Sequence, residues 1–208
     1  MPTTRRAFLR NTTALAGGLA LSTKLAAGVH NSVDDVIRIG LIGCGGRGTG
    51  AAVQALSTQQ NIQLVAMCDA FRDKVDKSYE NIKNQLIDND LDAKRLMVSD
   101  DHKFSGFDGY KKVIEACDVV LIATPPGFRP IHFEAAVAAD KHVFMEKPLA
   151  VDGPGVRRVL KAAEVAKQKK LNVVVGLQRH YQKKYADGWV DMMQNGVIGD
   201  ITASYVYW

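Results

Sequence analysis

The sequence predicts an α/β protein built on a doubly wound parallel sheet, followed by the start of a second, α+β domain. Two observations lead to this prediction. After residue 28, apolar runs of strand length alternate with longer amphipathic stretches, a pattern typical of repeated βαβ units. In addition, a glycine-rich segment joins the first apolar run to the first amphipathic stretch, where such a fold has a tight strand-to-helix turn.

The strands and helices of this first domain follow from the alternating pattern. We expect strands at 36–42, 62–68, 119–123, 142–145 and 171–176, with a shorter strand near 96–99. We expect helices at 46–56, 71–87, 109–116, 130–139 and 155–169. The run at 119–123 is apolar without a break, so it predicts a central strand that is buried on both faces.

The pattern changes near residue 182. A helix-like stretch covers 185–194 and ends at an Asn-Gly pair, and residues 200–208 carry apolar side chains at alternate positions, as a strand does. We therefore expect residues 29–181 to form the first domain and residues 182–208 to begin a second one.

The first 28 residues have the pattern of a twin-arginine signal peptide. Arg5 and Arg6 precede a weakly apolar run at 12–21, and small residues at 26–28 offer a cleavage site. A membrane anchor is the alternative, but this run falls short of the roughly 20 apolar residues that span a bilayer. We therefore expect residues 1–28 to address the protein to the twin-arginine export machinery and the mature protein to be periplasmic.

Composition argues against nucleic-acid and metal partners. Four of the 27 basic residues lie in the first 28 positions, where there is no acid, so the remainder carries 23 basic and 22 acidic residues. These charges are interspersed, so we expect no nucleic-acid binding. Cys44, Cys68 and Cys117 have neither disulfide nor zinc-site spacing, which predicts small buried side chains and no metal site.

The glycine-rich segment reads Gly43-Cys44-Gly45-Gly46-Arg47-Gly48. A turn of this kind between a strand and a helix is typical of a dinucleotide-binding Rossmann domain. Gly43 permits the tight turn, Gly45 lets the backbone approach the pyrophosphate, and Gly48 allows close packing of helix and strand. Free N–H groups at the positive end of the helix dipole then hold the pyrophosphate, with Gly46 and Arg47 in the same turn. The alternative is a glycine-rich turn that binds no ligand.

Asp69 ends the second predicted strand, 21 residues beyond Gly48. An acid at this position accepts hydrogen bonds from the adenosine ribose hydroxyls, which favours NAD over NADP. NADP stays open as the alternative, because Arg72, one helical turn away, or Arg47 could accommodate a 2′-phosphate. Asp69 could also cap the helix that follows, and capping is compatible with ribose binding.

Two short segments follow neighbouring strands, namely Thr124-Pro125 and Glu146-Lys147-Pro148. In a doubly wound sheet both emerge at the carboxyl edge, beside the crevice in which ligands bind. A lysine there can donate to a substrate oxygen, stabilise negative charge or share a proton. A solvated surface lysine is the alternative, but the strand-end position between Glu146 and Pro148 favours a catalytic role for Lys147.

The sequence carries the glycine-rich segment, Asp69, the Ala123-Thr124-Pro125 turn, and Lys141-His142-Val143 leading to Glu146-Lys147-Pro148. Together they resemble the Gfo/Idh/MocA family, which includes glucose-fructose oxidoreductase and inositol dehydrogenase. The resemblance covers residues 36–208. It implies that Lys147 lies beside the nicotinamide and the substrate, and that Glu146 and the Thr124-Pro125 turn line the cofactor pocket. It also implies that Arg179 lies near the substrate. His132 resembles a family histidine found after the turn, although the turn is longer here, and a packing or capping histidine is the alternative.

The resemblance implies hydride transfer between nicotinamide and a sugar, polyol or cyclitol. The family usually completes its site with an aspartate and a histidine of the second domain, whose sheet also mediates oligomer contacts. Neither residue appears before Trp208. We therefore expect a truncated member, with a homo-oligomer as the full-length form. An NAD-dependent glycosidase of the same family and a catalytically incompetent dinucleotide-binding fragment are the alternatives.

Overall fold

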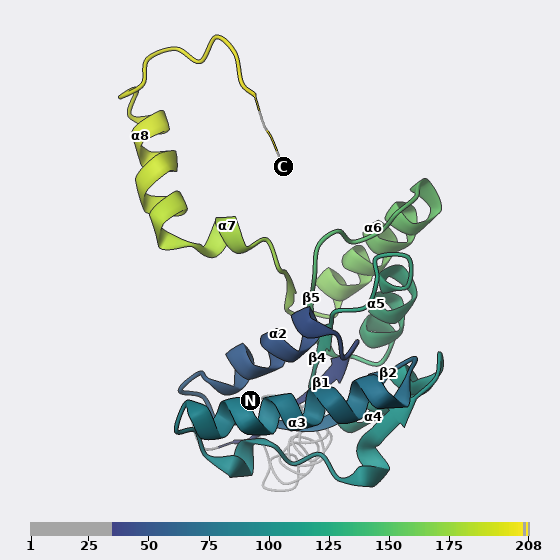
Figure 1. The fold of residues 1–208 in the computed structure, drawn as a ribbon. Helices are drawn as coiled ribbons and strands as arrows, with labels where there is room; N and C mark the ends of the chain where they lie inside the picture. Colours follow the sequence, from purple (N-terminus) through teal and green to yellow (C-terminus); the bar gives the residue numbers. More distant parts are fainter. Residues whose placement is uncertain (1–34, 206, 208) are drawn as a thin grey trace, which may run out of the picture. The chain divides into compact units, whose positions relative to one another are not determined.

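The computed structural model describes residues 35–205 and 207, and six parallel strands form its sheet (Figure 1). The strand order is β3-β2-β1-β4-β5-β6, which confirms the predicted doubly wound, Rossmann-type sheet. The strands are β1 (Ile37–Ile42), β2 (Ile62–Asp69), β3 (Lys103–Ser105), β4 (Val119–Ile122), β5 (His142–Met145) and β6 (Val173–Val175).

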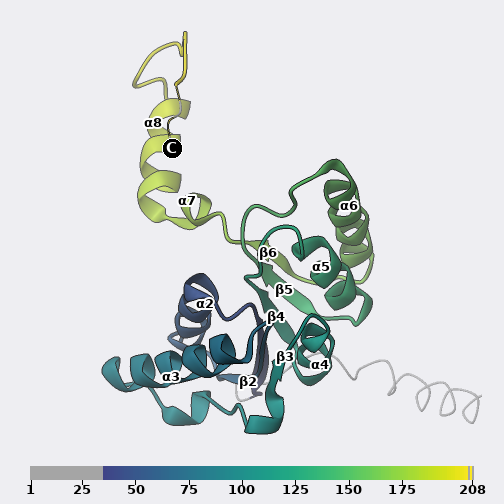
Figure 2. The ribbon, with the colours of Figure 1, turned by 45° about the vertical axis from the view of Figure 1, so that its right-hand side comes forward.

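Helices cover both faces of the sheet (Figure 2). The long ones are α2 (Gly46–Leu56), α3 (Arg72–Asp88), α4 (Gly109–Ala116), α5 (Arg129–Ala138) and α6 (Gly153–Gln168). Helices α2 and α3 share one apolar core with the sheet, and α4, α5 and α6 share another. Because side chains alternate along a strand, Leu121 of β4 enters the first core while Val120 and Ile122 enter the second. This two-sided burial explains the unbroken apolar run of β4.

The ends of the four central strands meet at one edge of the sheet. The Gly43 N–H, just after β1, donates to the Cys68 carbonyl of β2 at 2.8 Å. The Ala123 N–H, just after β4, donates to the Ile42 carbonyl at 2.8 Å. The Glu146 N–H, just after β5, donates to the Ile122 carbonyl at 2.9 Å. The chain reverses its direction of winding between β1 and β4, so this edge is the topological switch point, where such sheets bind ligands.

Most predicted elements are confirmed with bounds that differ by at most two residues. The strand near 96–99 is wrong, because Leu96 makes only an isolated bridge to Leu64. Short 3-10 turns at Ala93–Arg95 and Asp100–His102 flank this stretch, and the side chain of Asp92 caps the first of them. The edge strand forms later instead, at β3, where it pairs with the end of β2.

The C-terminal residues form short helices, namely α7 (Gln178–Tyr181), the π-helix η3 (Lys184–Val190) and α8 (Asp191–Gln194). The last two confirm the predicted helical stretch. The strand predicted at 200–208 is wrong for residues 201–205 and 207, which have no strand assignment. A strand is defined by hydrogen bonds to a neighbour, and these residues pair with none in the described chain. The start of a second domain at residue 182 stays a prediction.

The signal peptide predicted at 1–28 lies outside the described residues. Within the described part of the chain, no helix is both long enough and apolar enough to cross a membrane.

Candidate functional site

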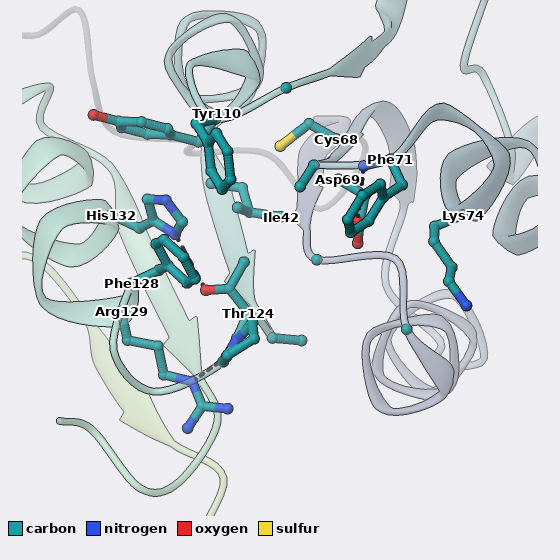
Figure 3. Close-up of a pocket in the computed structure, with 17 residues that line it drawn as sticks. Ile42, Cys68, Asp69, Phe71, Lys74, Tyr110, Thr124, Phe128, Arg129 and His132 are labelled. Atoms are coloured by element: carbon teal, nitrogen blue, oxygen red, sulfur yellow. Dashed lines mark hydrogen bonds between the residues drawn. The ribbon is translucent and has the colours of Figure 1, made fainter. Parts of the chain in front are cut away.

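A pocket of about 640 Å³ opens at the switch point. This volume falls within the range of roughly 300–1,000 Å³ that small-molecule sites occupy. Its walls come from the glycine segment, the end of β2, the start of α4, the turn after β4 and the start of α5 (Figure 3). The lining residues are Ile42, Gly43, Gly45, Cys68, Asp69, Ala70, Phe71, Lys74, Gly106, Phe107, Tyr110, Ala123, Thr124, Pro125, Phe128, Arg129 and His132.

Two glycines of the glycine segment are required by close backbone contacts. Gly43 has φ +97°, and a Cβ on it would lie 2.7 Å from the Thr124 nitrogen. A Cβ on Gly48 would overlap the Gly43 carbonyl oxygen, so α2 can approach β1 this closely only with glycine here. Beside Gly45 and Gly46, by contrast, the space within 4 Å of a Cβ is open. This open space lies where the pyrophosphate of a dinucleotide is expected.

The N-terminus of α2 has no side-chain cap. Its N-cap residue is Gly45, which has no side-chain acceptor, and the first turn contains no acidic residue. The N–H groups of a first helical turn have no partner within the helix, and they carry the positive end of the helix dipole. An anionic group in the open space beside Gly45 and Gly46 would supply the missing acceptor. The local geometry therefore fits a pyrophosphate.

Asp69 joins the end of β2 to the glycine segment. Its carboxylate accepts the Cys44 N–H at 2.8 Å and the Phe71 N–H at 3.2 Å, and it lines the pocket. Because α3 begins at Arg72 with Phe71 as its N-cap, Asp69 forms a turn before the helix and does not cap it. A carboxylate has about four acceptor positions, so two remain for ribose hydroxyls. The ribose contact itself stays a prediction.

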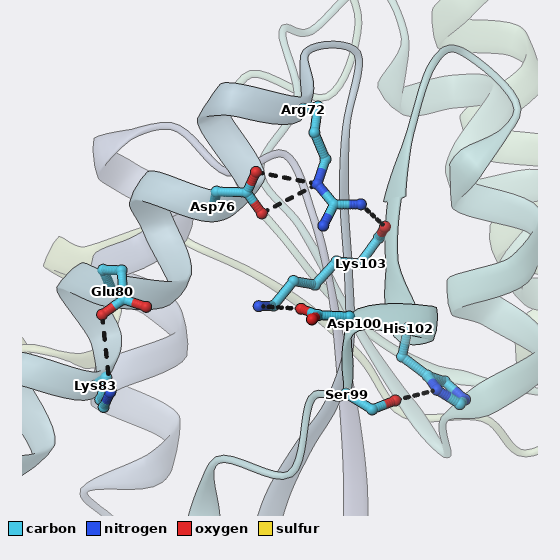
Figure 4. A network of polar contacts seen from close by, with 8 residues as sticks. All are labelled: Arg72, Asp76, Glu80, Lys83, Ser99, Asp100, His102 and Lys103. Atoms are coloured by element: carbon cyan, nitrogen blue, oxygen red, sulfur yellow. Dashed lines mark hydrogen bonds and ion pairs between the residues drawn. The ribbon is translucent and has the colours of Figure 1, made fainter.

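Arg72 lies outside the pocket lining. It belongs instead to a network of polar contacts on the protein (Figure 4). Its Nε donates to both carboxylate oxygens of Asp76, at 3.0 and 3.1 Å, and its Nη1 donates to the Lys103 carbonyl at 3.0 Å. Lys74, which the sequence reasoning missed, lines the pocket instead. The signal that could have found it is its position in the first turn of the helix that follows Asp69. A 2′-phosphate contact from Arg72 stays a prediction.

Thr124 and His132 form a polar pair on the pocket wall. The Thr124 Oγ1 and the His132 Nδ1 are 3.1 Å apart, and the Tyr110 ring lies 4.4 Å from the His132 ring, centroid to centroid. His132 is 7% exposed, and burial lowers its pKa to about 4. The imidazole is therefore neutral at neutral pH and both packs and hydrogen-bonds in the wall. Pro125, which follows Thr124, lines the same pocket.

Glu146 connects the turn after β5 to the glycine segment. Its buried Oε1 accepts the Arg47 Nε at 2.7 Å and forms an ion pair with the Arg47 Nη2 at 2.7 Å. A Cβ on Gly176 would lie 2.6 Å from the same oxygen, so glycine at the end of β6 makes room for this carboxylate. Arg47 thus pairs with Glu146, outside the lining of the pocket, and its contact with a 2′-phosphate stays a prediction.

Lys147 lies on the turn after β5, and Arg129 contacts the main chain of this turn. Lys147 is exposed and directly follows the buried Glu146, and its peptide bond to Pro148 is cis. Arg129, which the sequence reasoning did not single out, is buried and donates to the carbonyls of Thr124, Glu146 and Pro148. No sequence signal marks it, since its partners are main-chain atoms. Lys147 does not itself line the pocket.

Arg179 lies on α7, and its contacts are local. Its guanidinium carbon lies 4.4 Å from the centroid of the Tyr185 ring, and its side chain is exposed. It does not line the pocket described above. A location of Arg179 near the substrate stays a prediction.

The three cysteines are buried and free. Burial raises the pKa of each thiol, to about 12 for Cys68 and Cys117, so none is a thiolate at neutral pH. Among the residues that the structure describes, no group of three or more His, Cys, Asp or Glu side chains could hold a metal ion.

The sequence matches a known family over residues 37–177, described as "Oxidoreductase family, NAD-binding Rossmann fold". The chain belongs to the Gfo/Idh/MocA family. It is 35% identical over 160 residues to a glycosyl hydrolase family 109 protein of Solibacter usitatus, and this match covers 72% of this chain and 34% of that protein. It is 31% identical over 167 residues to an inositol 2-dehydrogenase of Serratia proteamaculans, and this match covers 79% of this chain and 43% of that enzyme.

Solved structures share the fold. The scyllo-inositol dehydrogenase of Lactobacillus casei, solved with bound NAD(H) and scyllo-inositol, has a TM-score of 0.58 and 24% identity over 81% of this chain and 44% of its own. The 3-ketoreductase KijD10 of Actinomadura kijaniata, in complex with NADP and TDP-benzene, has a TM-score of 0.60 and 22% identity over 80% and 45%. The chain thus spans less than half of the length of these relatives.

The packing of α2 on β1 predicts opposite effects for two neighbouring glycines. Gly48→Ala should destabilise the protein by about 3 kcal/mol or more, because the new Cβ overlaps the Gly43 carbonyl. Gly50→Ala, on the same helix with open space around its Cβ, should stabilise it by about 0.5–1 kcal/mol. Urea unfolding followed by circular dichroism measures both. Equal stability of the two variants would contradict the packing described.

The burial of His132 predicts a loss of stability in acid. Its pKa is about 4 in the folded state, against the ordinary histidine value of 6.5 in the unfolded chain, so the unfolded state binds more protons between these values. Stability should fall as the pH is lowered from 6.5 to 4, by about 3 kcal/mol from this group.

The free energy of unfolding at a series of pH values measures this effect. His132→Asn should flatten the pH dependence, whereas His102→Asn, which removes an exposed histidine, should leave it unchanged. An unchanged profile for His132→Asn would show that His132 is not the group responsible.

Proposed function

We propose that this protein is an NAD(P)-dependent oxidoreductase that transfers hydride between the nicotinamide and a carbon of a sugar, polyol or cyclitol. One observation carries the proposal. A single pocket at the switch point brings together the glycine segment, Asp69 and the Thr124-Pro125 turn, and Arg129 of its lining contacts the turn that bears Lys147. The inositol 2-dehydrogenase relatives support the substrate class.

We propose a place in the pocket for each part of the cofactor. The pyrophosphate would lie against Gly45 and Gly46 at the N-terminus of α2, where the N–H groups and the helix dipole favour an anion. The adenosine ribose would lie at Asp69, and the nicotinamide toward Thr124 and the turn after β5. When bound, the cofactor supplies the hydride chemistry.

Lys147 has the chemistry that the substrate oxygen requires. Its ammonium group can donate a hydrogen bond to a carbonyl oxygen, and it can deliver a proton to the alkoxide that forms when the carbonyl carbon is reduced. In the oxidation direction the amine accepts the hydroxyl proton. Glu146 and Arg129 fix the main chain on which Lys147 is carried.

The second candidate function is an NAD-dependent glycosidase that keeps its cofactor bound. The relative from Solibacter usitatus is named a glycosyl hydrolase family 109 protein, and this name supports the second candidate. In such a glycosidase, a tightly held NAD would oxidise and then re-reduce the sugar. The two candidate functions differ in their net production of NADH. A dehydrogenase accumulates NADH in proportion to the oxidised sugar, whereas the glycosidase cleaves a glycosidic bond with no net NADH.

We propose that the protein is exported to the periplasm by the twin-arginine machinery, on the strength of Arg5, Arg6 and the apolar run after them. Cell fractionation of an expressing bacterium tests this. We also propose that the protein forms a homo-oligomer.

Lys147→Ala should lower turnover by a factor of about 10²–10⁴ and leave dinucleotide affinity within a few-fold of wild type, because Lys147 lies outside the pocket lining. Absorbance at the NADH band measures turnover with a panel of inositols and sugars, and calorimetry measures affinity. Lys141→Ala, just before β5 at the opposite end of the same strand, is the matched control and should keep full turnover. Retained turnover in Lys147→Ala would exclude the lysine from catalysis.

Asp69→Ser tests the choice of cofactor. Removal of the carboxylate takes away the ribose acceptor and the repulsion against a 2′-phosphate, so the ratio of NAD to NADP affinity should fall by a factor of about ten or more. Asp88→Ser, at the C-terminal end of α3 and outside the pocket lining, should leave the ratio unchanged. An unchanged ratio in Asp69→Ser would remove the assignment of Asp69 to the ribose.

A further inference from the structure

Arg129 is the buried cation of the site. It begins α5 and is 6% exposed, and its guanidinium donates to main-chain carbonyls. The Nε donates to the Thr124 carbonyl at 2.7 Å, as Figure 3 shows. The Nη1 donates to the Glu146 carbonyl at 2.9 Å and to the Pro148 carbonyl. One side chain thus contacts the turn after β4 and the turn after β5.

The two carbonyls that Nη1 contacts lie on either side of Lys147. The Glu146 carbonyl belongs to the peptide group before Lys147, and the Pro148 carbonyl belongs to the peptide group after Pro148, so one nitrogen contacts the main chain on both sides of the Lys147-Pro148 pair. The Nε bond to Thr124 then ties this segment to the pocket wall. The main chain of Lys147 is therefore held in a fixed position relative to the turn against which the nicotinamide is expected.

Only an arginine has the geometry for this arrangement. The guanidinium is planar and presents several N–H groups in a rigid fork, so it reaches acceptors on two segments at once. A lysine carries the same charge as a single point at the end of a flexible chain. Burial lowers the pKa of Arg129, and the charge of the Glu146 carboxylate partly opposes this effect.

We propose that Arg129 is a positioning residue, which fixes the position of Lys147 relative to the Thr124-Pro125 turn. It acts through the main chain of residues 146–148 and does not react with the substrate. Its effect on turnover rests on the proposed function of Lys147, whereas its effect on the order of the turn does not. The two effects are therefore tested separately.

The first test needs no substrate. Hydrogen–deuterium exchange of the 208-residue chain is measured for Arg129→Lys and for Arg95→Lys. Arg95 is a matched control, since its Nη1 donates to the carbonyls of Leu56 and Thr58 at 2.8 and 2.9 Å, away from the pocket. We expect Arg129→Lys to speed exchange at the amide of Glu146, which donates to the Ile122 carbonyl at 2.9 Å, by a factor of about ten or more, with β1 and β2 unchanged.

Two results would overturn the proposal. Exchange at the Glu146 amide that equals wild type would show that Arg129 does not hold the turn. Exchange that rises equally in every strand would show a general loss of stability. If Arg129→Lys does not fold, Arg129→Gln keeps two N–H donors without the buried charge and is judged by the same local measurement.

The second test uses turnover. With a sugar or polyol that the protein oxidises, Arg129→Lys should lower kcat by a factor of about ten to a hundred while the dinucleotide Kd changes less than about threefold. An unchanged kcat, or a loss confined to KM, would contradict the positioning role. If Lys147→Ala retains turnover while Arg129→Lys loosens the turn, the positioning stands and the function proposed for Lys147 fails.

Discussion

The rest of the site depends on the close contact between Gly48 of α2 and the carbonyl of Gly43. This contact sets how near the helix begins to the end of β1, and only a residue without a Cβ permits it. It places an uncapped helix N-terminus over the carboxyl edge of the sheet. Asp69 then fixes the same segment from β2 through the Cys44 N–H. A shift of α2 away from the sheet would separate the anion-binding N–H groups from the rest of the pocket.

Two arginines connect the glycine segment, the turn after β4 and the turn after β5. Arg47 pairs with the side chain of Glu146, and Arg129 donates to the carbonyls that flank Lys147. The Glu146 carboxylate is buried with one of these cations as its partner, so removal of Arg47 would leave a buried charge uncompensated. Segments that are far apart in the sequence thus share a small set of polar contacts. Preorganisation of this kind lets a scaffold hold a reacting group within a fraction of an ångström.

Much of the fold could be predicted because its causes are local. Strand and helix periodicities fix β4 and α2, and the glycine pattern of Gly43 and Gly48 carries its own steric reason. The missed edge strand, β3, is only three residues long and is set by pairing with β2. Arg72 could not be placed from sequence, because its rotamer follows from Asp76 one turn later. Arg129 was missed because its partners are main-chain carbonyls, which have no sequence signal.

The central claim is that the pocket between the glycine segment and the turn after β4 holds a nicotinamide dinucleotide. The most direct test is a titration of the isotopically labelled 208-residue chain with NAD⁺, followed through its amide resonances. If the pocket holds the dinucleotide, saturable shifts are expected at Gly45, Asp69 and Thr124, with residues at the amino ends of the strands unaffected. No shifts at saturating NAD⁺ and NADP⁺, or shifts confined to the surface away from this pocket, would contradict it.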